Sequence, residues 1–129
     1  MQIKELIKEA HENAVNKGFW EEERTIGEQI ALMHSELSEA LEEARKFKTA
    51  KESDKRFYQI EKIYYSGENY ISTAETKICK KPEGFPIELA DTVIRIFDTC
   101  GKYGIDLEKA IEIKMAYNKT QPQKHGKNF

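Results

Sequence analysis

Apolar residues recur three or four positions apart in four stretches of the chain, which is the spacing of one helix face. In residues 2–17 they are followed by Gly18, a plausible helix stop. In the second stretch Thr25 and Glu28 match a capping box, so a long helix should begin there and run to about Phe47. The apolar positions of these two helices are Ile3, Leu6, Ile7, Ala10, Ala14 and Val15, then Ile26, Ile30, Met33, Leu37, Ala40, Leu41 and Ala44.

The third stretch begins at Pro86, which suits the first turn of a helix, and ends near Gly101 and Gly104. It is apolar on nearly every side, the pattern of a buried helix, through Ile87, Leu89, Ala90, Val93, Ile94, Ile96, Phe97 and Cys100. Asp106 can cap a fourth helix from about Leu107 to Tyr117. Its inward-facing residues should be Leu107, Ala110, Ile111 and Met115, and residues 120–129 should be irregular.

Residues 48–84 differ in character, because lysine, serine and tyrosine dominate and the periodicity is weak. Ser53 could cap a short helix to about Tyr64, and residues 70–78 could be extended. A connection of this length inside a compact domain is usually functional or disordered, and its aromatic residues argue against full disorder. We therefore predict an all-α, four-helix-type bundle that forms a single domain over residues 1–129, with a long irregular insertion at about 48–84.

Composition narrows the class of protein. Of 129 residues, 34% are charged and 39% hydrophobic, which suits a helical protein with exposed faces and a core that a partner subunit could complete. A net charge of −2 gives no general attraction to nucleic acid. Cys79 and Cys100 lack CxxC spacing, which favours reduced thiols and a cytoplasmic setting. No apolar run approaches the ~18 residues of a membrane span, so we expect no membrane partner.

Two pairs of acids stand out, Glu36 with Glu39 and Glu88 with Asp91. Residues three apart on a helix share a face, with Cβ atoms roughly 5–6 Å apart. Two carboxylates ~5 Å apart repel by about 3 kcal/mol at an effective dielectric constant of about 20, so four need compensation. Mg²⁺ prefers such oxygen ligands and leaves positions free for substrate phosphates. The plain alternative is a solvated acidic face.

Helix geometry bears on that choice. Glu36, Glu39 and Glu43 lie along one margin of an apolar stripe, where they are better placed to face a neighbouring helix than water. Asp91 and Arg95 are i, i+4 neighbours and could form only a salt bridge. That pairing would leave Glu88 without a partner, and buried carboxylates are rarely unpaired.

With both acidic pairs placed, the chain resembles the MazG-like, all-α nucleoside triphosphate pyrophosphohydrolases. That family is marked by an ExxE helix followed by an ExxD helix, which here are Glu36–Glu39 and Glu88–Asp91. The flanks that also resemble the family are residues 13–15 with 17–20, 34–42, 88–95, 114–120 and 124–127. Residues 40–87 separate the pairs by more than is usual in shorter members, which leaves loop contacts and substrate choice open.

The resemblance implies hydrolysis of a nucleoside triphosphate to a monophosphate and pyrophosphate, as house-cleaning of the nucleotide pool. It implies a homodimer or homotetramer, and Mg²⁺, or else Mn²⁺, bound by Glu36, Glu39, Glu88 and Asp91. Glu36, Glu39 and Glu43 are the catalytic candidates, since Glu39 or Glu43 could hold the attacking water.

Four residues are candidate nucleotide contacts: Trp20, Lys114, Asn118 and Lys119. Lys114, Asn118 and Lys119 would approach phosphate or nucleotide. Trp20, with Phe19, either plugs the end of the bundle or stacks on the base. The preferred nucleotide is left open by these residues.

Two other classes compete with the hydrolase. A di-iron or di-manganese carboxylate bundle binds its metals through Glu-x-x-His motifs, and no histidine of this sequence has a glutamate three residues before it. The stronger alternative is a non-catalytic helical dimer, an interaction module whose acids only make salt bridges. In such a protein the motif acids should tolerate amide substitution.

Overall fold

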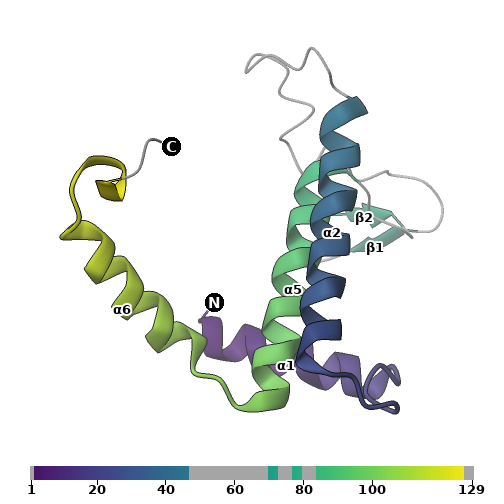
Figure 1. Cartoon of the computed structure of the whole chain (residues 1–129). Helices are drawn as coiled ribbons and strands as arrows, with labels where there is room; N and C mark the ends of the chain where they lie inside the picture. The colour runs from purple at the N-terminus through teal and green to yellow at the C-terminus, as the bar shows by residue number, and fades with distance from the viewer. Residues whose placement is uncertain (1, 47–69, 73–76, 80–83, 127–129) are drawn as a thin grey trace. The chain divides into compact units, whose positions relative to one another are not determined.

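The computed structural model describes residues 2–46, 70–72, 77–79 and 84–126 (Figure 1). It divides into two compact units, the first made of Met1–Glu22 with Phe97–Phe129 and the second of Glu23–Ile96. Most of the expected insertion, including the helix expected between Ser53 and Tyr64, lies outside the described residues.

Helices dominate the part of the chain that the structure describes, which confirms an all-α fold. They are α1 (Ile3–Asn16), α2 (Ile26–Lys46), α5 (Phe85–Tyr103) and α6 (Leu107–Lys119), so all four expected helices form close to their expected ends. Strands β1 (Tyr70–Ser72) and β2 (Lys77–Cys79) add a small antiparallel pair with Ile71 opposite Ile78. They include the described residues of the stretch expected to be extended, whose residues 73–76 lie outside the described ranges. The tail expected to be irregular contains a short 3-10 helix, η1 (Gln123–Gly126).

Side-chain caps define where two of the helices begin. The backbone N–H of Glu28 donates to Thr25 Oγ1 at 3.1 Å, and Thr25 Oγ1 donates to Glu28 Oε1 at 3.3 Å. At α6 the backbone N–H of Lys109 donates to Asp106 Oδ1 at 3.1 Å. Each cap satisfies a backbone donor that the first helical turn leaves unpaired, which is why α2 and α6 begin as the sequence predicts.

Glycines in the left-handed region end α1 and α5. Gly18 has φ +84° and Gly104 has φ +65°, a conformation that residues with a Cβ rarely adopt. After α1 the Phe19 N–H donates to the Ala14 carbonyl, and after α5 the Ile105 N–H donates to the Cys100 carbonyl. These are the closing bonds of the Schellman motif, so the helix stops follow from local sequence.

In the first unit, α1 lies against the last turns of α5 at an unusually close approach. A Cβ at Gly101 would lie 2.5 Å from His11 Cβ and 3.3 Å from the carbonyl oxygen of Ile7. Ala14 and Cys100 are buried, and burial raises the pKa of the Cys100 thiol. Only glycine at position 101 allows this spacing of the two helices.

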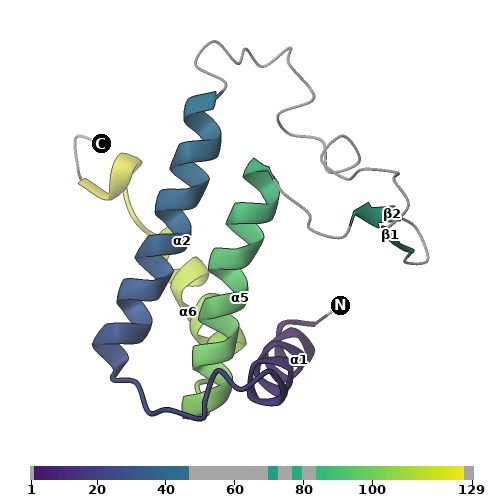
Figure 2. The ribbon, with the colours of Figure 1, turned by 90° about the vertical axis from the view of Figure 1, so that its right-hand side faces the viewer.

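In the second unit, α2 and the first part of α5, up to Ile96, run side by side in opposite directions (Figure 1 and Figure 2). Ala40 and Thr92 are buried there. The apolar stripe of α2 is only partly covered, however, and α5 is not the fully buried helix that its sequence predicts. The exposed apolar side chains of this unit are Ile26, Ile30, Leu37, Leu41, Leu89, Val93 and Ile94.

The expected inward face of α6 is also wrong in part, because Met115 is 58% exposed and Ala110 is exposed. The physical reason is the same in both units. A helix that is apolar on several sides needs several neighbours, and the described part of a single chain does not supply them. None of the described helices combines the length and the apolar character needed to cross a lipid bilayer.

Candidate metal centre

Three carboxylates of the second unit converge between its two helices. Glu36 comes from α2, and Glu88 and Asp91 come from the first turns of α5. One carboxylate oxygen of each lies within 4.8 Å of the others, and all three side chains are partly buried. The i, i+3 spacing places Glu88 and Asp91 on one face of α5, and α2 brings Glu36 to the same place. We call these three residues the acidic cluster.

Repulsion and burial disturb the protonation of the acidic cluster. Burial, followed by repulsion from the carboxylates of Asp91, Glu39 and Glu36, raises the pKa of Glu88 from its ordinary 4.5 to about 7. The pKa of Asp91 is also raised, chiefly by burial and then by Glu36 and Glu39, while Arg95 acts in the opposite direction. Both carboxyl groups are therefore harder to ionise than an exposed carboxyl group.

One oxygen of Glu88 points most clearly to a cation-binding role. Glu88 Oε2 is buried and has no hydrogen-bond partner among the described residues. Buried polar atoms are bonded in the large majority of cases, and an unpaired one costs about 1–3 kcal/mol. A cation between the three carboxylates would satisfy this oxygen and offset their repulsion. The donor set, carboxylate oxygen only, fits a hard ion such as Mg²⁺ or Mn²⁺.

Arg95 contacts the acidic cluster from one side. Its Nε donates to Glu36 Oε1 at 2.6 Å, across the two helices. The sequence suggests an i, i+4 pairing of Arg95 with Asp91, and the structure gives the close contact to Glu36 instead. Arg95 still lowers the pKa of Asp91 by its charge, so the guanidinium acts on two members of the cluster.

The other two acids expected at the site lie beside the cluster. Glu39 is exposed, yet it is close enough to Glu88 and Asp91 to raise the pKa of both. Glu43 is partly buried and follows Glu39 by about one helical turn. The structure thus brings together three of the four expected ligands as one cation-sized group, with Glu39 adjacent.

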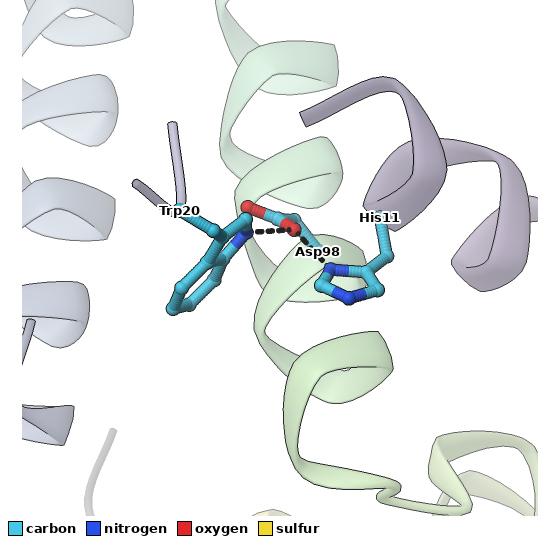
Figure 3. Close-up of polar contacts among 3 residues, drawn as sticks. All are labelled: His11, Trp20 and Asp98. Atoms are coloured by element: carbon cyan, nitrogen blue, oxygen red, sulfur yellow. Dashed lines mark hydrogen bonds and ion pairs between the residues drawn. The ribbon is translucent and has the colours of Figure 1, made fainter. Parts of the chain in front are cut away.

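Trp20, the candidate base platform, lies in the first unit and is held by polar contacts (Figure 3). Its Nε1 donates to Asp98 Oδ1 at 2.8 Å, and the same oxygen lies 2.9 Å from His11 Nδ1. The indole also meets the Tyr103 ring edge-on at 6.5 Å, and Lys102 Nζ lies 5.3 Å from its centroid. These contacts favour the packing interpretation of Trp20.

The remaining nucleotide candidates lie on α6 in the first unit. Lys114 is exposed, with its Nζ 4.9 Å from the centre of the Tyr117 ring. Lys119 is exposed, whereas Asn118 is partly buried and its Oδ1 has no hydrogen-bond partner in the described ranges. Their contact with a nucleotide stays a prediction.

The grouping of His11, Trp20 and Asp98 is not predicted by the sequence. A signal was present, because Asp98 is a polar exception on the otherwise apolar α5, as Glu88 and Asp91 are. Such exceptions need partners when a helix is packed. What the sequence does not give is which distant residues supply them.

Comparisons with protein-family models, with curated proteins and with solved structures found no match for this chain. The class of protein is therefore defined by its own fold and site: an all-α chain that carries a cluster of carboxylates between two antiparallel helices.

Proposed function

We propose that the chain is a Mg²⁺-dependent, MazG-like nucleoside triphosphate pyrophosphohydrolase, which cleaves a ribo- or deoxyribonucleoside triphosphate to a monophosphate and pyrophosphate. The observation that carries the proposal is the convergence of Glu36, Glu88 and Asp91 within 4.8 Å. The order of the two acidic motifs supports it. The proposed role is house-cleaning of the cytoplasmic nucleotide pool, with Mn²⁺ as a possible substitute ion.

In this proposal Glu36, Glu88 and Asp91 would hold the cation, with Glu39 as a fourth ligand. A divalent cation there would offset the charge of the phosphates and make the α-phosphorus more open to attack. The oxygen of a water molecule bonds to the α-phosphorus, and the bond from that phosphorus to the α,β-bridging oxygen breaks. Pyrophosphate leaves with the electron pair, and the water's proton passes to Glu39 or Glu43. The nucleotide contacts proposed are Lys114, Asn118 and Lys119.

We further propose that a homodimer or homotetramer covers the exposed apolar side chains of α2 and α5. Among them Ile26 is 60%, Leu41 50% and Ile94 50% exposed. Isolated exposed apolar residues are ordinary, but seven on two adjacent helices of one unit favour an interface. The same observation favours the second candidate function, a non-catalytic helical dimer that acts as an interaction module.

Product analysis separates the two candidates. The protein is incubated with a panel of ribo- and deoxyribonucleoside triphosphates, with and without Mg²⁺, and the products are resolved by ion-exchange chromatography. We expect monophosphate and pyrophosphate only with Mg²⁺. Glu36→Gln should lower turnover by more than about 10-fold, since even residues that only support a metal ligand are worth about 10–100-fold. Glu42→Gln is the matched control, because Glu42 is exposed on the same helix and pairs with Arg45.

Absence of turnover by folded protein across the panel would favour the interaction module. Diphosphate and inorganic phosphate as products would place cleavage at the other phosphoanhydride bond. Equal turnover in Glu36→Gln and Glu42→Gln would remove Glu36 from the catalytic machinery.

A further inference from the structure

The acidic cluster already has a cationic group in contact with it. Arg95 Nε lies 2.6 Å from Glu36 Oε1, a short charge-assisted hydrogen bond. The Glu36 side chain is only 13% exposed and that of Arg95 is 34% exposed, so water screens the pair less than it screens a surface pair. One of the two Glu36 oxygens is therefore engaged by a fixed positive charge.

A second arginine–glutamate pair on α2 shows what is particular about this contact. Arg45 Nη1 lies 2.7 Å from Glu42 Oε1, and those side chains are 62% and 66% exposed. The distances are similar, but Arg45 and Glu42 are neighbours on one helix in water. Arg95 instead reaches from α5 to Glu36 on α2, and Glu36 is a member of the acidic cluster.

A divalent cation and this guanidinium would compete for the same carboxylate. Both carry positive charge and both bind Glu36, so each makes the binding of the other to this carboxylate less favourable. The cluster without a cation, in contrast, needs a counter-charge, because one carboxylate oxygen of each of its three acids lies within 4.8 Å of the others. The positive charge of Arg95 therefore stabilises the carboxylates when no cation is bound, and it weakens the binding of a cation.

We propose that Arg95 is a built-in counter-ion of the acidic cluster, which engages Glu36 in the metal-free protein and releases that oxygen when a divalent cation binds. The inference rests on the proposed metal centre and deepens it, since Arg95 then sets the affinity of the site. Arg95 is a positioning residue: it acts through Glu36.

Cation affinity is the direct test, with free Mn²⁺ counted by electron paramagnetic resonance during titration of the protein. We expect Arg95→Gln to bind Mn²⁺ at least about tenfold more tightly than the wild type, equal to about 1.4 kcal/mol. Arg95→Lys keeps the charge but lacks the Nε–H donor, so its dissociation constant should fall between those two. Arg45→Gln, which removes the same charge from the exposed pair, should leave the constant unchanged.

Thermal unfolding gives a second readout. Without metal, Arg95→Gln should melt below the wild type because the carboxylates lose their counter-charge, and saturating Mn²⁺ should raise its melting temperature by more than it raises that of the wild type. Equal or weaker Mn²⁺ binding by Arg95→Gln, with wild-type binding intact, overturns the role of Arg95 and leaves the metal centre standing. No binding by either protein overturns both.

Discussion

The raised pKa of Glu88 makes the stability of the metal-free protein depend on pH in a way that one substitution should abolish. Glu88 has a pKa of about 7 in the folded chain against 4.5 ordinarily, chiefly because of burial. Between these values the folded chain holds more protons than the unfolded chain. The contribution of Glu88 to stability is therefore fully present below pH 4.5 and is lost as pH rises through about 7.

The size of the effect follows from the size of the shift. One pKa unit corresponds to about 1.4 kcal/mol, so the full shift would correspond to about 3 kcal/mol between pH 4.5 and pH 8. Glu88 is partly open to water, which reduces this figure, and we expect a loss of about 1–3 kcal/mol. Asp91, whose pKa is also raised, acts in the same direction.

Urea unfolding at pH 5 and pH 8 in the presence of a chelator measures this loss. The wild type should lose about 1–3 kcal/mol more than Glu88→Gln over that interval, because glutamine has no proton to lose. Glu42→Gln, at an exposed position of α2, should follow the wild type. Excess Mg²⁺ at pH 8 should restore much of the loss in the wild type and little in Glu88→Gln. Parallel pH profiles for the wild type and Glu88→Gln would show that Glu88 does not titrate in this way.

Two further predictions concern the first unit. Asp98→Asn should lower the free energy of unfolding by about 1–3 kcal/mol, because the carboxylate oxygen shared by His11 and Trp20 is lost. Urea unfolding, followed by the fluorescence emission of Trp20, the single tryptophan, measures this change. Unchanged stability would contradict the role of this contact. Gly101→Ala should cost about 1–3 kcal/mol by forcing α1 away from α5. Gly27→Ala, where a Cβ would meet only Thr25 Oγ1 at an ordinary 3.7 Å, should be neutral or slightly stabilising. Equal effects of the two substitutions in thermal unfolding would show that the close approach is not required.

The helices follow from signals that lie within a few residues of each other. Thr25 and Asp106 mark two helix starts, and Gly18 and Gly104 mark two helix ends, and each does so through a backbone or side-chain bond to a near neighbour. Local chemistry of this kind depends little on the rest of the fold, so sequence is sufficient to predict it.

Packing and pairing between residues far apart in the chain are harder to predict from the sequence. Trp20 and Asp98 are separated by 78 positions, and nothing local to either residue selects the other. Arg95 has an allowed partner one turn away in Asp91, yet its hydrogen bond goes to Glu36, 59 positions distant. The spacing of Glu88 and Asp91 places them on one face, and the sequence predicts Glu36 and Glu39 as their partners. Only the antiparallel contact of α2 with α5 shows that Glu36, and not Glu39, completes the group within 4.8 Å.

The apolar pattern likewise predicts which side chains need to be buried, but it does not identify the residues that bury them. Leu41 and Ile94 belong to predicted apolar faces, and each is 50% exposed in the chain. The pattern correctly marks both positions as hydrophobic, but whether the same chain or another covers such a face is a matter of tertiary and quaternary contacts.

Binding of a divalent cation by the acidic cluster is tested most directly by anomalous diffraction from crystals grown with Mn²⁺. We expect an anomalous peak within coordination distance of Glu36, Glu88 and Asp91, with the Arg95 guanidinium no longer on Glu36. A map with no peak at these carboxylates at saturating Mn²⁺, and with Arg95 still bonded to Glu36, would contradict the assignment of a metal centre.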